Sequence, residues 1–339
     1  MNRQSPTLED VARTAGVSPA TVSRCLNSPD LVRAEIRDRV MAVVDELGYV
    51  PHGAARALAS RRSRTVGAIF PSLESTLFGG TIEALQSRLT EAGYTLAVAS
   101  SGYDAGREHE HVRNLIASGV DALVLVGARR DEKVYRILEQ KSVPYVLLWV
   151  TEADAPHVCV GFDNFAAAQQ VVRYLLDLGH RRFALISGRA GDNDRAAARL
   201  AGMKAALADA GLSLEPSHLI ESDFGIAQGR RAFRKLMEDP DRPTAVVCGS
   251  EPFAYGAIFE AREMGLDVPG DVSITGFDNM ELAAQLTPAL TSMQTPQVEM
   301  GVLAAEHLLA RLAGEEVEPP PPLKTELIVR DSAGPPPAG

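Results

Sequence analysis

The stretch TLEDVARTAGVSPATVSRCLN, residues 7–27, carries the signals of two consecutive helices and decides how the chain begins to fold. Thr7 is placed to cap the first helix, acidic residues follow in its first turn, and Gly16 can end it in a left-handed conformation. Ser18 can cap the second helix, and Pro19 then occupies the first helical position, where the missing N–H of proline breaks no hydrogen bond of the helix. The stretch therefore predicts two short helices joined by a tight turn.

The second helix has only a narrow apolar edge, formed by Val22 and Leu26, and we expect Cys25 to belong to the core. Its other face presents small and polar side chains, which suit a helix that must lie deep in a DNA groove. A third helix over residues 34–48 has apolar residues at helical spacing and stops at Gly48. Together these patterns predict a helix-turn-helix whose second helix reads the major groove.

The charge of the chain is divided unevenly between its beginning and the remainder. Residues 1–64 hold ten Arg, no Lys and seven acidic residues, a net charge of +3, whereas the whole chain has a net charge of -10. The remainder therefore carries -13. A basic head on an acidic body is expected where one module meets nucleic acid, although a solvated charged face remains the alternative for any single Arg.

Composition and length limit the class of protein. The 339 residues are 45% hydrophobic and 23% charged, which is ordinary for globular domains and allows more than one core. No apolar run is long enough for a bilayer, and the N-terminal stretch has acidic residues where a signal peptide needs an apolar core. Cys25, Cys159 and Cys248 are too few and too far apart for a disulfide framework or a zinc site. We therefore expect a cytoplasmic protein without a membrane anchor or a metal.

The head resembles that of the LacI family of bacterial transcription repressors, through TLEDVARTAGVSPATVSRCLN and the later LGYVPHGAARALA. The resemblance implies that Pro19, Ala20 and Arg24 read bases, with Arg24 paired to guanine O6 and N7. For Thr7 and Ser18, capping alone is an equally good interpretation. The expected phosphate contacts are Thr7, Ser18, Thr21, Ser23 and Asn27.

Residues 51–62 form the second informative segment of the head. Pro51 interrupts the chain, and the short alanine-rich helix that follows is too short to be stable alone in water. In the LacI family this segment is a hinge helix that orders on operator DNA. The resemblance places Leu58 as the wedge between central base pairs, with the small Ala55 and Ala59 beside it. The alternative is an alanine-rich linker.

From residue 65 onward, short apolar runs alternate with helical segments, which is the βαβ rhythm of a parallel sheet. The rhythm occurs twice, so we expect an α/β body of two doubly wound lobes that resembles the periplasmic sugar-binding fold. The family resemblance places crossovers between the lobes near residues 162, 291 and 324. The predicted domains are a helix-turn-helix at 1–50, a hinge helix at 51–62, an effector-binding and dimerisation body at 63–332, and a disordered tail at 333–339.

Ligands of such folds bind beyond the carboxyl ends of the strands, where polar residues are candidates for contact. By resemblance, Arg199 and Asp278 hold an effector's hydroxyl or acid groups, and Phe224 packs on its apolar face. Ordinary core packing is the alternative for the two phenylalanines, and a surface ion pair is the alternative for Arg199. Two positions depart from the family pattern and alter expected hydroxyl contacts, which weakens the inference of a common sugar. The full predicted set is Ser72, Phe78, Trp149, Arg199, Phe224, Ser250 and Asp278, with Trp149 and Ser250 as the departures.

Other classes of protein fit the sequence less well. The seven His include one close pair, His109 and His111, whose spacing does not share a helix face, and no nucleophile or metal motif of an enzyme occurs. An exported sugar-binding protein would lack the head, whereas a regulator with a protein effector would need no ligand-sized cleft. We therefore predict a regulator without cofactor or metal. It would bind a pseudo-palindromic operator as a homodimer or a tetramer and respond to a sugar or a sugar acid, as stretches similar to the gluconate-repressor branch suggest.

Overall fold

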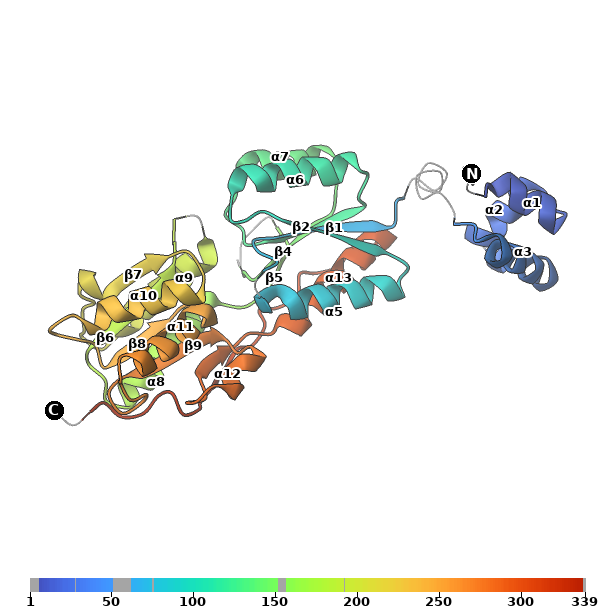
Figure 1. Cartoon of the computed structure of the whole chain (residues 1–339). Coiled ribbons are helices and arrows are strands. Elements are labelled where there is room, and N and C mark those ends of the chain that lie inside the picture. Colours follow the sequence, from blue (N-terminus) through green and yellow to red (C-terminus); the bar gives the residue numbers. More distant parts are fainter. Residues whose placement is uncertain are drawn as a thin grey trace. The chain divides into compact units, whose positions relative to one another are not determined.

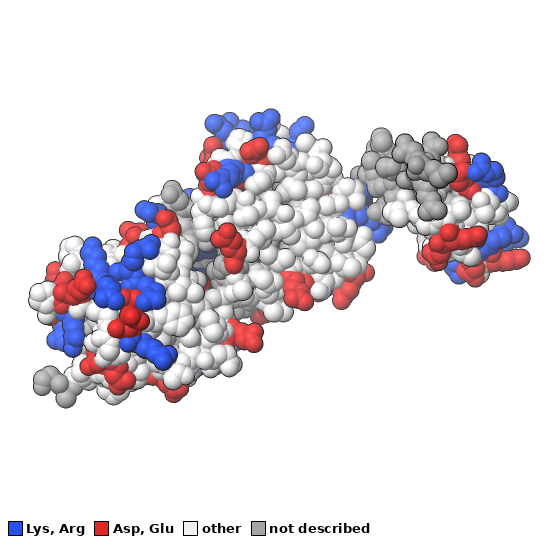
Figure 2. All heavy atoms as spheres, in the orientation of Figure 1, with Lys and Arg blue, Asp and Glu red and all other residues white. Residues whose placement is uncertain are grey.

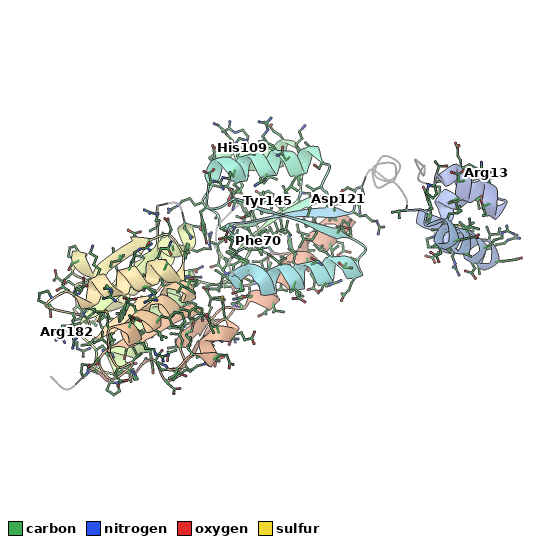
Figure 3. The ribbon with its side chains drawn as sticks, in the orientation of Figure 1. Arg13, Phe70, His109, Asp121, Tyr145 and Arg182 are labelled. Atoms are coloured by element: carbon green, nitrogen blue, oxygen red, sulfur yellow. The ribbon has the colours of Figure 1, made fainter. Side chains whose placement is uncertain are left out.

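A computed structural model describes residues 6–27, 29–50, 62–74, 76–151, 157–191 and 193–337. The chain divides into two compact units, Met1–Ser63 and Arg64–Gly339. We call them the head and the body. The body begins at Arg64, whose backbone N–H donates to Oδ2 of Asp121 at 2.8 Å (Figure 3).

The described residues of the head form three α-helices in the arrangement that the sequence predicts (Figure 1). Thr7 caps the first helix, because its hydroxyl accepts the Asp10 N–H at 3.2 Å while the Asp10 carboxylate accepts the Thr7 N–H at 3.0 Å. Gly16 and Gly48 end the first and third helices with φ of 65° and 61°, a conformation that glycine adopts without strain. The helices are α1 Leu8–Ala15, α2 Pro19–Asn27 and α3 Ala34–Leu47, with a 3-10 turn at Pro29–Leu31.

The core of the head joins the apolar edges of all three helices. Val22 and Cys25 of α2 are buried against α1 and α3, which confirms the prediction that Cys25 is a core residue. The buried set is Val11, Ala12, Ala15, Val22, Cys25, Val40, Val43 and Val44. Because α2 contributes only this narrow edge, the rest of its surface is left for solvent or a partner.

The first lobe of the body is a parallel sheet with strand order β2-β1-β3-β4-β5. Helices α6 and α7 cover one face of this sheet, while α5 and α13 cover the other (Figure 1). The strands are β1 Thr65–Phe70, β2 Thr95–Ser100, β3 Ala122–Val126, β4 Tyr145–Leu148 and β5 Cys159–Val160. The helices are α5 Gly79–Glu91, α6 Ala105–Ala117, α7 Glu132–Gln140 and α13 Gln297–Ala313, with a 3-10 turn at Thr76–Phe78.

The second lobe has the strand order β11-β10-β9-β8-β6-β7, in which only β11 runs antiparallel to its neighbour. The strands are β6 Phe183–Gly188, β7 Leu219–Ser222, β8 Ala245–Cys248, β9 Ser273–Asp278, β10 Thr291–Gln294 and β11 Glu326–Ile328. The helices are α8 Asn164–Asp177, α9 Asp194–Asp209, α10 Ile226–Met237, α11 Glu251–Glu263 and α12 Glu281–Gln285, with a 3-10 turn at Pro216–His218. Both lobes are therefore the doubly wound α/β units that the sequence predicts.

Alternation along the central strands of the second lobe explains its three layers. Phe183 and Leu185 of β6 pack in the same cluster as α8 and α9, whereas Ala184 and Ile186 pack with α10 and α11. Since successive side chains of a strand point to opposite faces, a continuous apolar run buries both faces at once. The first lobe follows the same rule, for Phe70 of β1 is fully buried in the cluster that includes α5 (Figure 3).

The chain passes between the lobes at three places within the body. It leaves the first sheet after Val160 and starts α8 of the second lobe at Asn164, and it returns after Gln294 to form α13 on the first lobe. The last passage lies between α13 and β11. All three passages lie near the expected positions, and the second comes after Gln294 because β10 still pairs with β9 in the second sheet.

The end of the chain differs from the predicted disordered tail at 333–339. The backbone of Gly334 accepts a hydrogen bond from His180 at 2.8 Å and donates one to the Ser273 hydroxyl at 3.0 Å. His180 is fully buried and also contacts the hydroxyls of Thr244 and Ser273, so this segment joins a buried polar network. Among the described helices, none combines the length and the apolar character that a bilayer crossing requires.

Candidate functional site

The exposed face of α2 presents the residues that the sequence assigns to base reading. Pro19, Ala20 and Arg24 are exposed, while Thr21 and Ser23 are half-buried. Ala20 and Arg24 are four positions apart and therefore lie on one face of the helix. On the face drawn in Figure 2, the head displays Arg side chains beside acidic ones.

Thr7 and Ser18 both have a structural role at helix starts. The Thr7 hydroxyl belongs to the capping box of α1, and the Ser18 hydroxyl accepts the backbone N–H of Thr21 at 3.2 Å. These contacts agree with the capping interpretation and leave the predicted phosphate contacts as predictions. The side chain of Asn27, and the hinge residues Ala55, Leu58 and Ala59, lie outside the described residues.

The body encloses a small cavity of about 30 Å³ whose walls come from both lobes. Five of the seven residues predicted to bind the effector meet there. The first lobe contributes Leu77, Phe78, Tyr103 and Trp149, and the second lobe contributes Asn193, Arg195, Ala196, Arg199, Phe224, Gly249 and Ser250. Because both lobes line one cavity, a ligand bound there would couple their relative positions.

Arg199 of α9 is held rigidly in the wall of this cavity. Its Nε donates to Oδ1 of Asn164 at 2.8 Å, and its Nη1 donates to the carbonyl of Gly249 at 2.9 Å. Its Nη2 pairs with Asp278 Oδ1 at 3.5 Å, and its guanidinium lies 3.8 Å from the ring centre of Phe277. This set of partners excludes the surface ion pair that was the alternative for Arg199, whose side chain is 8% exposed.

Asp278 at the end of β9 completes this network from behind the cavity. Its carboxylate accepts the Ser250 hydroxyl at 3.3 Å as well as the Arg199 guanidinium. Burial raises the pKa of Asp278 to about 7, although the charge of Arg199 acts in the opposite direction. Glu251, whose pKa burial also raises, lies next to this pair and accepts hydrogen bonds from Tyr255 and Ser292. The site therefore contains two carboxyl groups that bind protons more tightly than usual.

Aromatic rings form the apolar walls. Phe78 meets Trp149 edge to face at 4.8 Å between ring centres, and Phe224 stacks on Tyr103 at 5.2 Å. Gly188 at the end of β6 is required for this packing, because a Cβ there would lie 2.3 Å from the Phe224 ring. The buried Phe78 therefore belongs both to the core and to the cavity wall, which were alternatives in the sequence.

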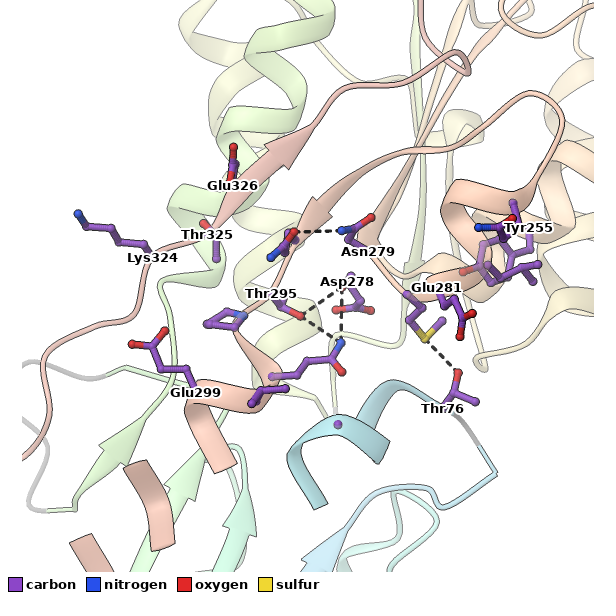
Figure 4. A pocket seen from close by; sticks show the side chains of 18 residues that line it. Thr76, Tyr255, Asp278, Asn279, Glu281, Thr295, Glu299, Lys324, Thr325 and Glu326 are labelled. Atoms are coloured by element: carbon purple, nitrogen blue, oxygen red, sulfur yellow. Dashed lines mark hydrogen bonds between the residues drawn. The ribbon is translucent and has the colours of Figure 1, made fainter. Parts of the chain in front are cut away.

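Ser72 is the predicted contact that the structure leaves out of the cavity lining. Its hydroxyl accepts the backbone N–H of Glu74 at 3.2 Å, so the local turn uses its acceptor. A larger groove of about 1330 Å³ opens elsewhere between the lobes, with Thr76 and Thr295 among its lining residues (Figure 4). Asp278 lines this groove, whereas the predicted aromatic and arginine contacts line the small cavity.

Several cavity residues were not predicted from the sequence. Tyr103 follows β2, and Asn193 caps α9 after β6, so their positions beyond strand ends could have suggested them. Arg195 stands in the first turn of α9 beside Asp194. Asn164 joins Trp149 to Arg199, since its Nδ2 donates to the Trp149 carbonyl at 2.8 Å. No local pattern marks that last role.

A carboxylate from the second lobe also joins the lobes beside the cavity. Asp194 Oδ2 accepts the backbone N–H groups of Ala128 and Arg129 at 2.5 and 2.9 Å. Burial alone would raise the pKa of Asp194, but Arg195 and the backbone donors outweigh it and lower that pKa. Arg129 in turn donates to the carbonyls of Ala190 and Gly191, both at 2.9 Å. The lobes therefore contact each other through charged hydrogen bonds as well as through the cavity walls.

Comparison with known proteins places both units in one family. Residues 7–52 match the model described as "Bacterial regulatory proteins, lacI family", and residues 172–333 match a "Periplasmic binding protein-like domain". The chain is 33% identical over 319 residues to the HTH-type transcriptional regulator GntR of Escherichia coli K12, covering 94% of this chain and 96% of that protein. It is 34% identical over 315 residues to the HTH-type transcriptional repressor PurR of Escherichia coli O139:H28, covering 92% of each.

Solved structures of LacI-family regulators also superimpose on this chain. A LacI-family regulator from Silicibacter pomeroyi superimposes with a TM-score of 0.87 at 26% identity, covering 96% of this chain and 99% of that one. The lac repressor dimer bound to operator and the anti-inducer ONPF superimposes with a TM-score of 0.86 at 28% identity, covering 98% and 100%. These relatives are regulators rather than enzymes. With its helix-turn-helix head and two-lobed body, this chain belongs to the LacI family of bacterial regulatory proteins.

Proposed function

We infer that this protein represses transcription by binding a pseudo-palindromic operator as a homodimer, and that a small effector in the body controls this binding. The observation that carries the proposal is that one cavity joins both lobes around the buried Arg199–Asp278 pair. An effector that binds more tightly to one arrangement of the lobes shifts the population toward that arrangement.

The head supports the operator part of the proposal. Arg24 and Ala20 form an exposed, thin face of α2 that fits a major groove, and Arg24 offers a bidentate pair to guanine. We propose the hinge segment, with Leu58 as a minor-groove wedge and Ala55 and Ala59 beside it, on the resemblance alone.

The first lobe supports the dimer. Strand β2 lies at the edge of its sheet, and Val98 in the middle of that strand is 37% exposed. Exposed edge strands with apolar side chains need a cover, and a second copy of the chain provides one. The visible face of this lobe also has a broad area without charged side chains (Figure 2). The lac repressor, which superimposes on this chain, is a dimer on its operator.

The effector part follows from the lining of the cavity. Arginine, hydroxyl and amide groups beside aromatic rings bind polar ligands that also have an apolar face, as sugars and sugar acids do. These side chains suit both sugars and sugar acids. Ser250 and Trp149 stand where the family has other groups. We therefore propose that a small polyhydroxylated metabolite binds in this cavity and controls operator binding.

The test is selection of operator sites from randomised duplex DNA, followed by titration with sugars and sugar acids at one stated salt concentration. We expect a two-fold symmetric site, a dimer in sedimentation, and at least one ligand that raises the melting temperature and changes operator affinity. DNA binding without sequence preference would overturn the operator proposal. A ligand that stabilises the body without changing operator affinity would overturn the proposal that the effector controls operator binding.

A further inference from the structure

The charged side chains that line the cavity are of one sign. Arg195 and Arg199 belong to its wall, whereas no Asp or Glu is among the described residues that line it. Asp278 lies behind the wall, where its carboxylate is already bound by Arg199 and Ser250. A ligand in the cavity therefore meets two positive groups directly and the negative group only through Arg199.

The two arginines differ in how many of their N–H donors the protein uses. Arg199 places its Nε, Nη1 and Nη2 on three separate partners within the protein. Arg195 has one side-chain hydrogen bond among the described contacts, from Nη1 to Asp194 Oδ1 at 2.7 Å. Its other guanidinium donors remain for a ligand, since arginine has five N–H donors. Arg195 is therefore the cationic group of the wall with unused donors.

Neighbouring groups fix the position of Arg195 and share the carboxylate of its partner, Asp194. Asp194 also accepts three backbone N–H groups, from Ala128, Arg129 and Arg195 itself, so its charge is spread over several donors. Gly127 has φ 80°, and a Cβ there would lie 2.0 Å from Arg195 Nη1. The absence of a side chain at Gly127 therefore gives the guanidinium its room against the first lobe.

Trp149 supplies a second unused donor in the same wall. The residue is 1% exposed, and its indole N–H has no hydrogen-bond partner among the residues that the structure describes. A buried indole N–H usually has a partner, because an unpaired buried donor costs free energy. Trp149 also has φ 63°, a conformation that bulky residues rarely adopt and that marks functional sites.

The backbone around Trp149 keeps this donor in place. The backbone N–H of Trp149 donates to the Val160 carbonyl at 3.2 Å, and the backbone carbonyl of Trp149 accepts a hydrogen bond from Nδ2 of Asn164. Since Asn164 also binds Arg199, the indole and the arginine are linked through one amide. The wall thus offers an immobilised neutral donor and a cationic donor, and an acceptor with negative charge satisfies both.

We propose that the effector is a small organic acid, a hydroxy acid whose carboxylate is bound by Arg195 and the indole N–H of Trp149. The inference rests on the proposed function and selects the acid over the neutral sugar. The rings of Phe78 and Phe224 contact the apolar face of the ligand, and Arg199, which Asp278 holds from behind the wall, faces its hydroxyl groups. At about 30 Å³ the cavity has room for about two water molecules, so a hydroxy acid can bind only when the cavity walls move apart.

The experiment uses the full chain and its single tryptophan, so that emission reports on the cavity directly. Matched probes differ only in the acid group: D-gluconate against D-glucitol, D-galactonate against D-galactitol, and glycerate against glycerol. D-glucose 6-phosphate tests a phosphate ester as the source of the anion. At least one acid is expected to change Trp149 emission and raise the melting temperature at a concentration at least 10-fold below that of its alcohol.

Variants then test the two donors. Arg195→Met should weaken binding of the acid at least 10-fold and leave the weak binding of the alcohol unchanged, whereas Arg195→Lys should retain part of the affinity. Arg173→Met is the matched control, because Arg173 pairs with Asp209 on the exposed surface of α8. Trp149→Phe keeps an aromatic ring and removes the indole N–H. Because this variant has no tryptophan emission, its binding of the acid is measured by calorimetry. The single indole signal in a ¹H–¹⁵N spectrum of the unaltered protein should move downfield with the acid.

Several outcomes overturn the inference. These are equal responses to acid and alcohol, no response to any acid, a preference for the phosphate ester over every carboxylate, or full affinity for the acid in Arg195→Met. Operator titrations separate this failure from failure of the proposed function. A neutral polyol that changes operator affinity would leave the proposed function standing and overturn the acid, whereas a protein without operator preference would overturn the proposed function itself.

Discussion

The head and the body of this protein build their functional surfaces over very different distances along the chain. The reading face of α2 comes from nine consecutive residues, and the cap of α1 joins Thr7 to Asp10, three positions away. In the body, the partners of Arg199 are 35, 50 and 79 positions away. Substitutions on the exposed face of α2 should therefore alter DNA binding alone, whereas substitutions in the cavity wall should alter ligand binding and folding together.

The largest expected effect is on the buried pair of the body. Arg199→Met removes a cationic side chain from the cavity wall, and Asp278→Asn removes the charge that holds Arg199 in place, so each should cost about 2–5 kcal/mol of effector affinity. Operator affinity without effector should stay within twofold of the unaltered protein, as measured by fluorescence anisotropy. A variant that still responds at the original effector concentration would remove that residue from the site.

The matching change in the head should have the opposite profile. Arg24→Ala should lower operator affinity by about 1–3 kcal/mol and relax the preference at one guanine of each half-site, while effector binding stays unchanged. Binding is measured on operators with each base at that position, with Arg173→Ala as the surface control. An equal loss on every sequence would make Arg24 a phosphate contact rather than a base contact.

The pH dependence of stability should separate the units further. Because the pKa of Asp278 is about 7 in the folded body and about 3.9 in an unfolded chain, folding takes up a proton between these values. The contribution of Asp278 to the free energy of unfolding is full below pH 4 and is lost as the pH rises to 7. We expect the unaltered body to lose on the order of 2 kcal/mol between pH 5 and 8 relative to Asp278→Asn.

Calorimetry at several pH values measures this difference, with Asp223→Asn as the control. Arg189 lowers the pKa of the exposed Asp223, mainly by a hydrogen bond, so this carboxylate stays ionised in both states above pH 5 and contributes no slope there. A stability difference between the unaltered protein and Asp278→Asn that does not vary with pH would contradict the prediction.

The smallest expected effect is on the cap of the head. Thr7→Ala removes the hydroxyl that accepts the Asp10 N–H and should destabilise α1 by about 1 kcal/mol, whereas Thr7→Ser should keep the cap. Hydrogen exchange of residues 8–15 should increase in Thr7→Ala and stay unchanged in the body. If operator affinity falls with no change in exchange, Thr7 contacts DNA rather than serving only as a cap.

The amino-acid sequence by itself determined the parts whose signals are local. Thr7, Gly16 and Gly48 mark the helix ends that the structure shows, and the predicted narrow edge of Val22 and Leu26 packs in the core of the head, where Cys25 is also buried. The βαβ rhythm likewise predicted two doubly wound lobes, because a strand buried on both faces needs a continuous apolar run. These features depend on neighbours within one turn or one strand, so one sequence is enough to find them.

Only the tertiary structure decided which side chains meet. Arg195 and Tyr103 reach the cavity from different lobes, Ser72 uses its hydroxyl within a turn, and Gly334 packs on His180 across 154 positions. The direction of a side chain and the approach of the lobes depend on the packing of every intervening element. The physical reason is that buried polar groups form hydrogen bonds with whichever groups the fold brings next to them. The spacing of residues along the chain does not predict which groups those are.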